Sequence, residues 1–239
     1  MFPDLLYVIM DKRITGVGVI IAAGGRGTRM RGSVPKQFLL LKGKPIMQRT
    51  VEVFEQHPLV HEIVIVGPLP NLERVRRIVK RSGFRKVSRV VSGGTERQDS
   101  VWKGLNSFVE QPRIVLVHDA VRPLVTKRVI SEVIRLAAKH KAAVAGVRVK
   151  DTIKVEQARG YLSRTLDRAK LWAVQTPQGF HFDLLLRAHK AARRAAIRAT
   201  DEASLIERMN IPVRIVEGDY RNIKITTRGD LTTAGLWLR

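Results

Sequence analysis

The chain alternates between apolar runs and segments of helical period over its first 150 residues. The apolar runs lie at residues 17–23, 62–67, 86–93, 113–120 and 142–149. Several of them lack in-and-out alternation, as strands buried on both faces do. Segments with apolar residues at helical spacing separate the runs, at residues 45–57, 71–82, 95–108 and 126–140. This order predicts the fold class α/β, with a doubly wound and mostly parallel sheet.

The pattern changes after residue 150, where residues 151–180 alternate apolar and polar positions around a Gly turn. This alternation predicts a projecting β-hairpin arm at about residues 148–172. Helical patterns return at residues 181–198, 202–209 and 228–238, with strands expected at 212–218 and 222–226. No linker or repeat divides the chain, so we expect a single domain over residues 1–239. Residues 1–16 are interpreted as an extra strand, a disordered leader or a misassigned start, and not as a targeting signal.

Composition excludes several classes of protein. No stretch approaches the roughly 18 to 20 uncharged apolar residues of a membrane-spanning helix. The chain has no cysteine, which excludes disulfides, Cys-based zinc sites and thiol catalysis and fits a reducing cytoplasm. We therefore expect a cytoplasmic protein with no membrane partner.

The net charge of +23, from 44 Lys and Arg against 21 Asp and Glu, is the unusual bulk feature. Much of the positive charge falls in two runs of helical spacing, residues 73–86 and 187–198. These runs are interpreted as the solvated outer faces of amphipathic helices. Aromatic residues make up only 5% of the chain and do not alternate with the charges, so a nucleic-acid partner is not expected. A nucleic-acid-binding protein remains the alternative from another class.

A loop rich in glycine and basic residues follows the first apolar run. Its members are Gly24, Gly25, Arg26, Gly27, Arg29, Arg31 and Lys36. Glycines expose backbone amides to phosphate oxygens, and the basic side chains add charge-assisted donors. In an open α/β sheet, ligands bind beyond the carboxyl ends of the strands. The loop matches neither the P-loop nor the dinucleotide fingerprint, so we expect another kind of polyphosphate site.

Further motifs narrow the assignment. The segments "AGGRGTRM…PKQF", "SGGTERQDSV", "VHDAVRP", "DTIK", "TLDR…LWAVQTPQGF", "TDEAS" and "VEGDYRNIKIT" resemble, in order and spacing, those of the 2-C-methyl-D-erythritol 4-phosphate cytidylyltransferase family. The resemblance spans about residues 17 to 238. It implies a Rossmann-like nucleotidyltransferase fold and an enzyme that joins CTP and methylerythritol phosphate to give 4-diphosphocytidyl-2-C-methyl-D-erythritol and pyrophosphate, in non-mevalonate isoprenoid synthesis. Ribitol 5-phosphate is the alternative acceptor, which the residues leave open.

The resemblance also implies roles for individual residues. It maps catalysis onto Arg29, Lys36 and Lys224, and CTP binding onto Ala22, Ala23, Gly24, Gly25, Gly27, Gly94, Thr95, Ser100, Asp119 and Ala120. It maps acceptor binding onto Arg122, Thr152, Arg168, Thr176 and Thr200. Asp119 would hold Mg²⁺ or another divalent cation between triphosphate oxygens. In the family the arm exchanges with that of a second subunit, which implies a homodimer in which Thr152 and Arg168 serve the neighbour's site.

The residues themselves support these roles unequally. Pro35 fixes the backbone before Lys36 and favours a positioned loop. Thr95 is a candidate N-cap with glycine in front of it, which suits a base or a phosphate. Without the resemblance, in contrast, Lys224 is interpreted as an edge residue of a short strand. Each threonine mapped to acceptor binding is then interpreted as a β-former on a strand surface. His118 is expected to be structural.

Overall fold

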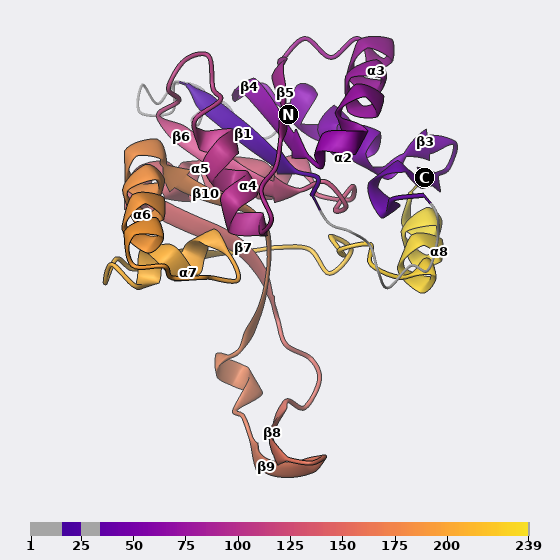
Figure 1. Ribbon diagram of the computed structural model, residues 1–239. Helices are drawn as coiled ribbons and strands as arrows, with labels where there is room; N and C mark the ends of the chain where they lie inside the picture. The colour runs from indigo at the N-terminus through magenta and orange to yellow at the C-terminus, as the bar shows by residue number, and fades with distance from the viewer. Residues whose placement is uncertain (1–15, 25–33, 239) are drawn as a thin grey trace.

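The computed structural model describes residues 16–24 and 34–238 (Figure 1). Its centre is a seven-stranded sheet in the order β11 (Arg214–Glu217), β7 (Ala142–Arg148), β10 (Trp172–His181), β6 (Ile114–Asp119), β1 (Val17–Ala22), β4 (Val60–Gly67) and β5 (Val87–Ser92). Neighbouring strands are parallel, except that β10 runs antiparallel to both β6 and β7. The predicted α/β class with a doubly wound, mostly parallel sheet is confirmed.

Helices cover both faces of this sheet. One face packs against α2 (Ile46–Glu55), α3 (Leu72–Ser82) and α5 (Lys127–His140), and the other against α4 (Arg97–Leu105), α6 (Phe182–Arg194) and α7 (Glu202–Glu207). Val19 and Ile21 of β1 face the first layer, and Ile20 faces the second. All three are fully buried, and burying each such side chain stabilises the fold by about 2 to 3 kcal/mol. This explains why the strand has no polar alternation.

A smaller apolar cluster supports the entrance to the site. The chain from residue 34 onward forms the 3-10 helix η3 (Lys36–Phe38) and a short hairpin of β2 (Leu40–Leu41) and β3 (Lys44–Pro45). The final helix, α8 (Arg228–Trp237), packs on this hairpin. A capping box between Thr227 and Asp230 starts α8, which begins at the residue where the sequence pattern predicts a helix.

The arm projects away from the sheet (Figure 1). It consists of the antiparallel hairpin β8 (Lys154–Ala158) and β9 (Tyr161–Thr165), followed by the 3-10 helix η5 (Arg168–Lys170). The hairpin turns at Arg159 and Gly160, whose φ angles are 51° and 83°. Glycine adopts such positive φ values without strain.

Only the first part of the alternating pattern of residues 151–180 belongs to the arm. Residues Trp172–His181 form β10, inserted between β6 and β7. The polar residues that gave the alternation are buried in the domain: Gln178 donates to Asp201 over 2.7 Å, and Asn222 donates to Gln175 over 3.3 Å. Buried and paired glutamines look in sequence like the exposed side of a hairpin strand.

The strand expected at residues 222–226 is also absent, since these residues form an irregular segment in the structure. Side chains anchor this segment in place of a strand ladder: the Asn222 amide donates to the Thr176 carbonyl over 2.9 Å. The Arg122 guanidinium donates to the Asn222 carbonyl over 2.7 Å. Lys224 therefore lies on a loop, which corrects its interpretation as an edge-strand residue.

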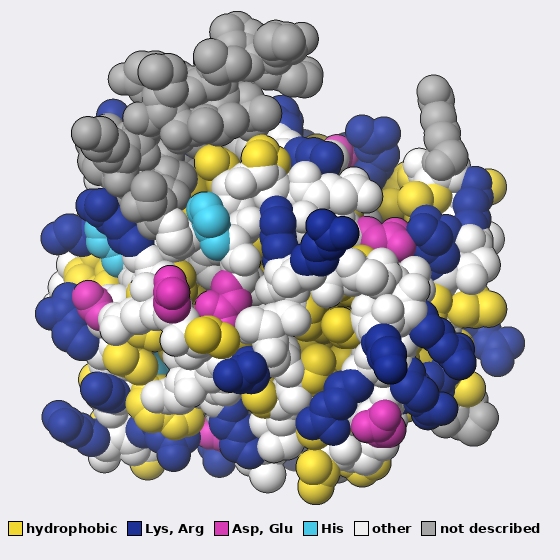
Figure 2. All heavy atoms as spheres, turned by 90° about the horizontal axis from the view of Figure 1, so that it is seen from above, with side chains coloured by type: hydrophobic (Ala, Val, Ile, Leu, Met, Phe, Trp, Pro, Cys, Tyr) yellow, Lys and Arg dark blue, Asp and Glu magenta, His cyan; other side chains and the backbone are white. Residues whose placement is uncertain are grey.

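The two basic runs lie largely on helices, as expected. Arg74, Arg76, Arg77 and Lys80 are exposed on α3. The second run is helical only as far as Arg194, where α6 ends. Figure 2 shows Lys and Arg side chains spread over much of the face seen from above, with fewer Asp and Glu side chains among them. None of the helices in the described ranges has the length and apolarity needed to cross a membrane.

Candidate active site

The site lies at the carboxyl ends of β6, β1, β4 and β5, where the strand order reverses around β1. Backbone hydrogen bonds hold the four strand ends together. Ala120 donates to Ala22 over 3.0 Å, Ala23 donates to Val66 over 2.7 Å, and Gly93 donates to Gly67 over 2.8 Å. A switch point at the carboxyl edge of an open α/β sheet is the usual place for a ligand.

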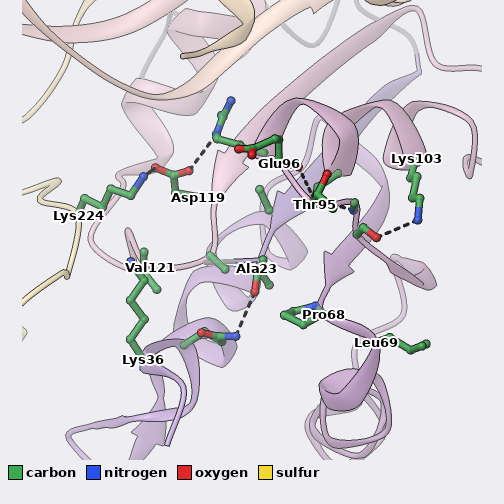
Figure 3. A pocket seen from close by; sticks show the side chains of 18 residues that line it. Ala23, Lys36, Pro68, Leu69, Thr95, Glu96, Lys103, Asp119, Val121 and Lys224 are labelled. Carbon is green, nitrogen blue, oxygen red and sulfur yellow. Dashed lines mark hydrogen bonds and ion pairs between the residues drawn. The ribbon is translucent and has the colours of Figure 1, made fainter. Parts of the chain in front are cut away.

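A pocket of about 700 Å³ opens at this edge. The described residues that line it are Ala22, Ala23, Gly24, Lys36, Gln37, Pro68, Leu69, Gly93, Gly94, Thr95, Glu96, Arg97, Ser100, Lys103, Asp119, Ala120, Val121 and Lys224. Four of these side chains are cationic and two are acidic, so the lining favours an anion. Figure 3 shows Lys36 and Lys224 on one side of the pocket and Thr95 and Lys103 on the other.

The wall on the α4 side is built from glycines and a helix start. A Cβ on Gly94 would lie 2.2 Å from the Cβ of Asp99, so only glycine fits there. The Gly94 amide donates to the Ser100 hydroxyl over 3.1 Å. The prediction that Thr95 is the N-cap is wrong: Glu96 is the N-cap and forms a capping box with Asp99. The Thr95 hydroxyl instead donates to Asp99 over 3.1 Å, because the chain enters the helix one residue later.

Asp119 lies between three cations at the end of β6. Its Oδ2 is 2.9 Å from Lys224 Nζ and 3.4 Å from Arg122 Nε, and its Oδ1 is 3.6 Å from Arg97 Nε. Burial by itself raises the pKa of Asp119, but Lys224, Arg97 and Arg122 together lower it well below its usual range. The residue is therefore a carboxylate at any pH at which the protein would work.

Thr176 and His118 fix the backbone of Asp119. The Asp119 amide donates to the Thr176 hydroxyl over 3.1 Å, and this hydroxyl lies 3.0 Å from His118 Nδ1. His118 Nε2 lies 3.1 Å from the Arg122 carbonyl, which only accepts. One proton arrangement satisfies all three contacts: Nε2–H donates to Arg122, and the threonine donates to Nδ1. Burial lowers the pKa of His118 to about 4, which agrees with this neutral ring and with its expected structural role.

Lys36 enters the pocket from η3, directly after Pro35, whose φ is −57°. Its side chain is 9% exposed. The neighbouring Gln37 donates to the Ala23 carbonyl over 3.1 Å and thereby ties η3 to the end of β1. The geometry agrees with the positioned loop that Pro35 predicts.

Arg97 extends the charged cluster away from the pocket. Its Nη1 lies 2.7 Å and 2.6 Å from the two carboxylate oxygens of Glu202, the buried first residue of α7. Burial by itself lowers the pKa of Arg97, but Glu202 and Asp119 raise it above its usual value. The guanidinium thus stays charged and joins α4, α7 and Asp119.

The structure brings together most of the residues predicted for CTP binding and catalysis. Ala22, Ala23, Gly24, Lys36, Gly94, Thr95, Ser100, Asp119, Ala120 and Lys224 all line the pocket. Gly25, Gly27 and Arg29 lie outside the described residues, as do Arg26 and Arg31.

The residues predicted for the acceptor are not gathered on this lining. Thr176 and Arg122 lie behind Asp119, with their polar groups bonded within the protein. Thr152 and Arg168 are exposed on the arm. Thr200 lines a second pocket of about 620 Å³, which shares Glu96 and Arg97 with the first.

Several pocket residues were not predicted from the sequence. Arg97 falls inside a motif that was interpreted as a capped helix, and Lys103 follows two turns later on α4. Pro68 and Leu69 come from the turn after β4. The position of Arg97 in the first turn after two glycines was the available signal, but its partner Glu202 is too distant in sequence to be paired with it.

Comparison with known proteins decides the family. The family model for 2-C-methyl-D-erythritol 4-phosphate cytidylyltransferase matches residues 17–239. The chain belongs to this family. A cytidylyltransferase of the family from Symbiobacterium thermophilum is 48% identical over 222 residues, which cover 93% of this chain and 92% of that protein.

Solved structures of the family have the same fold. The 4-diphosphocytidyl-2C-methyl-D-erythritol synthase of Anaerococcus prevotii has a TM-score of 0.82 and 27% identity, over 94% of this chain and 96% of that one. The Thermus thermophilus cytidylyltransferase has a TM-score of 0.74 and 31% identity, over 93% and 98%. This member of the family is therefore an enzyme, a nucleotidyltransferase that acts as a methylerythritol phosphate cytidylyltransferase. The relatives do not favour the alternatives of ribitol phosphate or nucleic acid.

Proposed function

We propose that this cytidylyltransferase uses CTP as its donor and carries out the transfer in the pocket at the carboxyl edge of the sheet. A phosphate oxygen of methylerythritol phosphate attacks the α-phosphorus of CTP, the bond from that phosphorus to the bridging oxygen breaks, and pyrophosphate leaves. The observation that carries the proposal is the meeting of Lys36, Asp119 and Lys224, from three separate segments, on one pocket lining.

The α4 side of the pocket suits the nucleoside. Gly93 and Gly94 both line the pocket without side chains, so the backbone on this side can be approached closely by a flat ring. Ser100, 4% exposed, holds the Gly94 amide and donates to the Glu96 carbonyl over 3.0 Å, so this wall is rigid before the nucleotide arrives. Ala22, Ala23 and Gly24 also line the pocket, and their small size keeps this part of it open. We assign the cytosine and ribose to this half of the pocket.

The other half suits the reacting phosphate. Phosphoryl-type transfer depends on alignment and on neutralising charge more than on a side-chain nucleophile. We assign to Lys36 and Lys224, which both line the pocket, the stabilisation of the charge that develops on the α-phosphate, and the resemblance adds Arg29. In enzymes generally, one such donor contributes about 3 to 4 kcal/mol to transition-state stabilisation.

The donor set at Asp119 fits a divalent cation brought in with the nucleotide. Among the residues that the structure describes, no group of three His, Cys, Asp or Glu side chains is placed to hold a metal ion. Mg²⁺ sites of this kind take one or two carboxylates and complete their shell with substrate phosphates and water. Asp119 Oδ1, which lies 3.6 Å from Arg97 Nε, is the oxygen we assign to Mg²⁺. When bound, Mg²⁺ would neutralise triphosphate charge.

The acceptor half of the site is proposed to include the arm. Thr152 and Arg168 are exposed on it, and a threonine hydroxyl and a guanidinium suit a polyol and its phosphate. The tip of the hairpin also exposes Tyr161 and Leu162, at 76% and 61%, an apolar surface that a second subunit would bury. We propose a homodimer through the arm, with Thr200 contributing to the acceptor site from the main domain. The lack of cysteine supports a cytoplasmic location.

The test is a pyrophosphate-release assay with Mg²⁺. CTP, UTP and ATP are each paired with methylerythritol 4-phosphate, with ribitol 5-phosphate and with no acceptor. The proposal predicts release with CTP and methylerythritol phosphate only, and a cytidine diphosphate ester by mass spectrometry. Equal release with UTP would contradict the donor assignment, and release without acceptor would contradict the transfer.

A further inference from the structure

The arm leaves the main domain at a root made of two strand ends. β7 ends at Arg148 and β10 begins at Trp172, and the Arg148 guanidinium stacks 4.2 Å from the Trp172 ring centre. The Val149 amide donates to the Leu171 carbonyl over 3.3 Å. Arg168, on the arm, donates to the Lys150 carbonyl over 2.9 Å. The two segments of the root are therefore bonded to each other, and they continue directly into the arm.

The segment that carries Lys224 passes close to this root. We call residues 218–225, between β11 and α8, the Lys224 loop. Its first residue, Gly218, donates to the Gly146 carbonyl over 2.7 Å, and a Cβ there would lie 2.5 Å from Gln175 Oε1. Its last residue, Ile225, donates to the Val121 carbonyl over 2.9 Å. The loop is thus fixed at both ends to strands of the sheet and to the end of β6.

Tyr220 connects the Lys224 loop to the arm root. Its hydroxyl donates to the Arg148 carbonyl over 2.9 Å. The Lys150 ammonium lies 3.7 Å from the centre of its ring. Both contacts fall on the last residues before the arm, and the side chain is 45% exposed and does not line the pocket. Tyr220, four residues before Lys224 in the sequence, thus makes its polar contacts with the arm root.

We propose that Tyr220 is a positioning residue that sets the direction in which the arm leaves the domain and ties this direction to the loop of Lys224. The inference rests on the proposed function, in which arm residues bind the acceptor and Lys224 acts on the α-phosphate. Thr152 comes directly after the first segment of the root and Arg168 shortly before the second, so a change in the root angle displaces both. Tyr220 is not among the described residues that line the pocket, so we expect the CTP half to stay unchanged.

Three variants test the proposal. Tyr220→Phe removes the hydroxyl and keeps the ring for Lys150, while Tyr220→Leu removes both contacts. Arg221→Gln is the matched control, because this neighbouring side chain, 61% exposed, pairs with Asp219 inside the loop and does not reach the arm. KM for each substrate and kcat are measured, together with hydrogen exchange of the root peptide around Val149 and with the melting temperature.

The expected result is a split between the substrates. KM for methylerythritol phosphate rises about threefold in Tyr220→Phe and about tenfold in Tyr220→Leu, as expected for losing one hydrogen bond and then the cation–π contact as well. KM for CTP stays within about twofold and Arg221→Gln matches the wild type. Exchange at the root becomes faster in Tyr220→Leu.

A lower melting temperature with both KM values unchanged would overturn the proposal, since Tyr220 would then only stabilise the fold. An equal rise in both KM values would also overturn it. If the wild type transfers nothing, it is the proposed function that fails. Hydrogen exchange still tests the link between the Lys224 loop and the arm root in that case, and an unchanged exchange rate in Tyr220→Leu would refute it.

Discussion

Lys224 Nζ lies 2.9 Å from Oδ2 of Asp119, although one residue is on the loop before the last helix and the other ends a central strand. The pair occupies the switch point of the sheet, beside Ala22 at the end of β1. Lys224 is 39% exposed and Asp119 only 9%, so the lysine can move while the carboxylate cannot. We interpret the pair as the resting state of a cation that turns to the α-phosphate when CTP binds.

Replacing Lys224 with methionine should therefore act on catalysis more than on folding. The expected loss in kcat is about 10²- to 10³-fold, the usual effect of removing one donor to a developing oxyanion. Asp119 keeps Arg97 and Arg122, so the melting temperature should change little. Lys44→Met, which breaks an exposed pair with Glu52 outside the pocket, is the control and should keep full activity. Comparable kcat values for the two variants would remove Lys224 from the catalytic set.

A mixing experiment tests whether the arm serves a second subunit. Lys36→Ala should lower turnover by orders of magnitude with little change in melting temperature. Arg168→Ala should be impaired as well, through the arm. If the site is shared across a dimer, mixing the two inactive variants restores some activity, because one site in each heterodimer then has both residues. No recovery, with heterodimers shown to form, would mean that each chain builds its own site.

Two glycines of the pocket should respond differently to alanine. A Cβ on Gly24 would lie 3.6 Å from the Ser100 hydroxyl, an ordinary contact, so Gly24→Ala should keep KM for CTP within about twofold. A Cβ on Gly94 would lie 2.2 Å from that of Asp99 and must displace the start of α4. Gly94→Ala should destabilise the fold by about 1 to 3 kcal/mol and raise KM for CTP. Thermal melting and initial rates measure both effects, and a tolerated Gly94→Ala would refute the wall geometry.

Stability should fall on mild acidification because of three buried histidines. Burial lowers the pKa of His57, His118 and His189 to about 4. Between about pH 6.5 and pH 4 the unfolded chain binds protons at these rings and the folded chain does not. The free energy of unfolding therefore decreases as the pH falls through this window, by up to about 1.4 kcal/mol per pH unit for each ring. Above about pH 6.5 the three rings do not contribute to its pH dependence.

Urea unfolding at pH 7, 6 and 5 measures this slope, and His189→Leu provides the control. Within the described chain neither ring nitrogen of His189 has a hydrogen-bond partner. Replacing His189 should reduce by up to one the number of protons that the chain takes up on unfolding, and should make the pH dependence of stability correspondingly less steep. It should also raise the free energy of unfolding at pH 7 by about 1 kcal/mol. A slope that stays the same in His189→Leu would contradict the assignment of a low pKa to this ring.

The parts of the fold that could be predicted are those in which local sequence and burial agree. β1 is apolar throughout and β4 and β6 each contain an unbroken apolar run, because both faces of the sheet are covered, and each strand was located within a few residues. β10 was not, because Gln175 and Gln178 are buried with partners from Asn222 and Asp201, far along the chain. A polar residue that is satisfied by a distant segment carries no local sign of being buried.

The same distinction applies to the site. Asp119 ends a strand, and Gly94 and Lys36 belong to segments that follow strands, where a parallel sheet places its ligand, so their convergence could be anticipated. The bonds of Thr176 to the Asp119 amide and to His118 could not, and the sequence interpretation made Thr176 a substrate ligand instead. Glu202, whose partner Arg97 is on another helix, was missed for the same reason.

The most direct test of the account is a crystal structure of the enzyme with CTP and Mg²⁺. It should place the cytosine against Gly94 and Ser100, and the α-phosphate within hydrogen-bond distance of Lys36 and Lys224, with Lys224 moved away from Asp119. A nucleotide bound elsewhere, or an α-phosphate that neither lysine reaches, would contradict the assignment of this pocket as the active site.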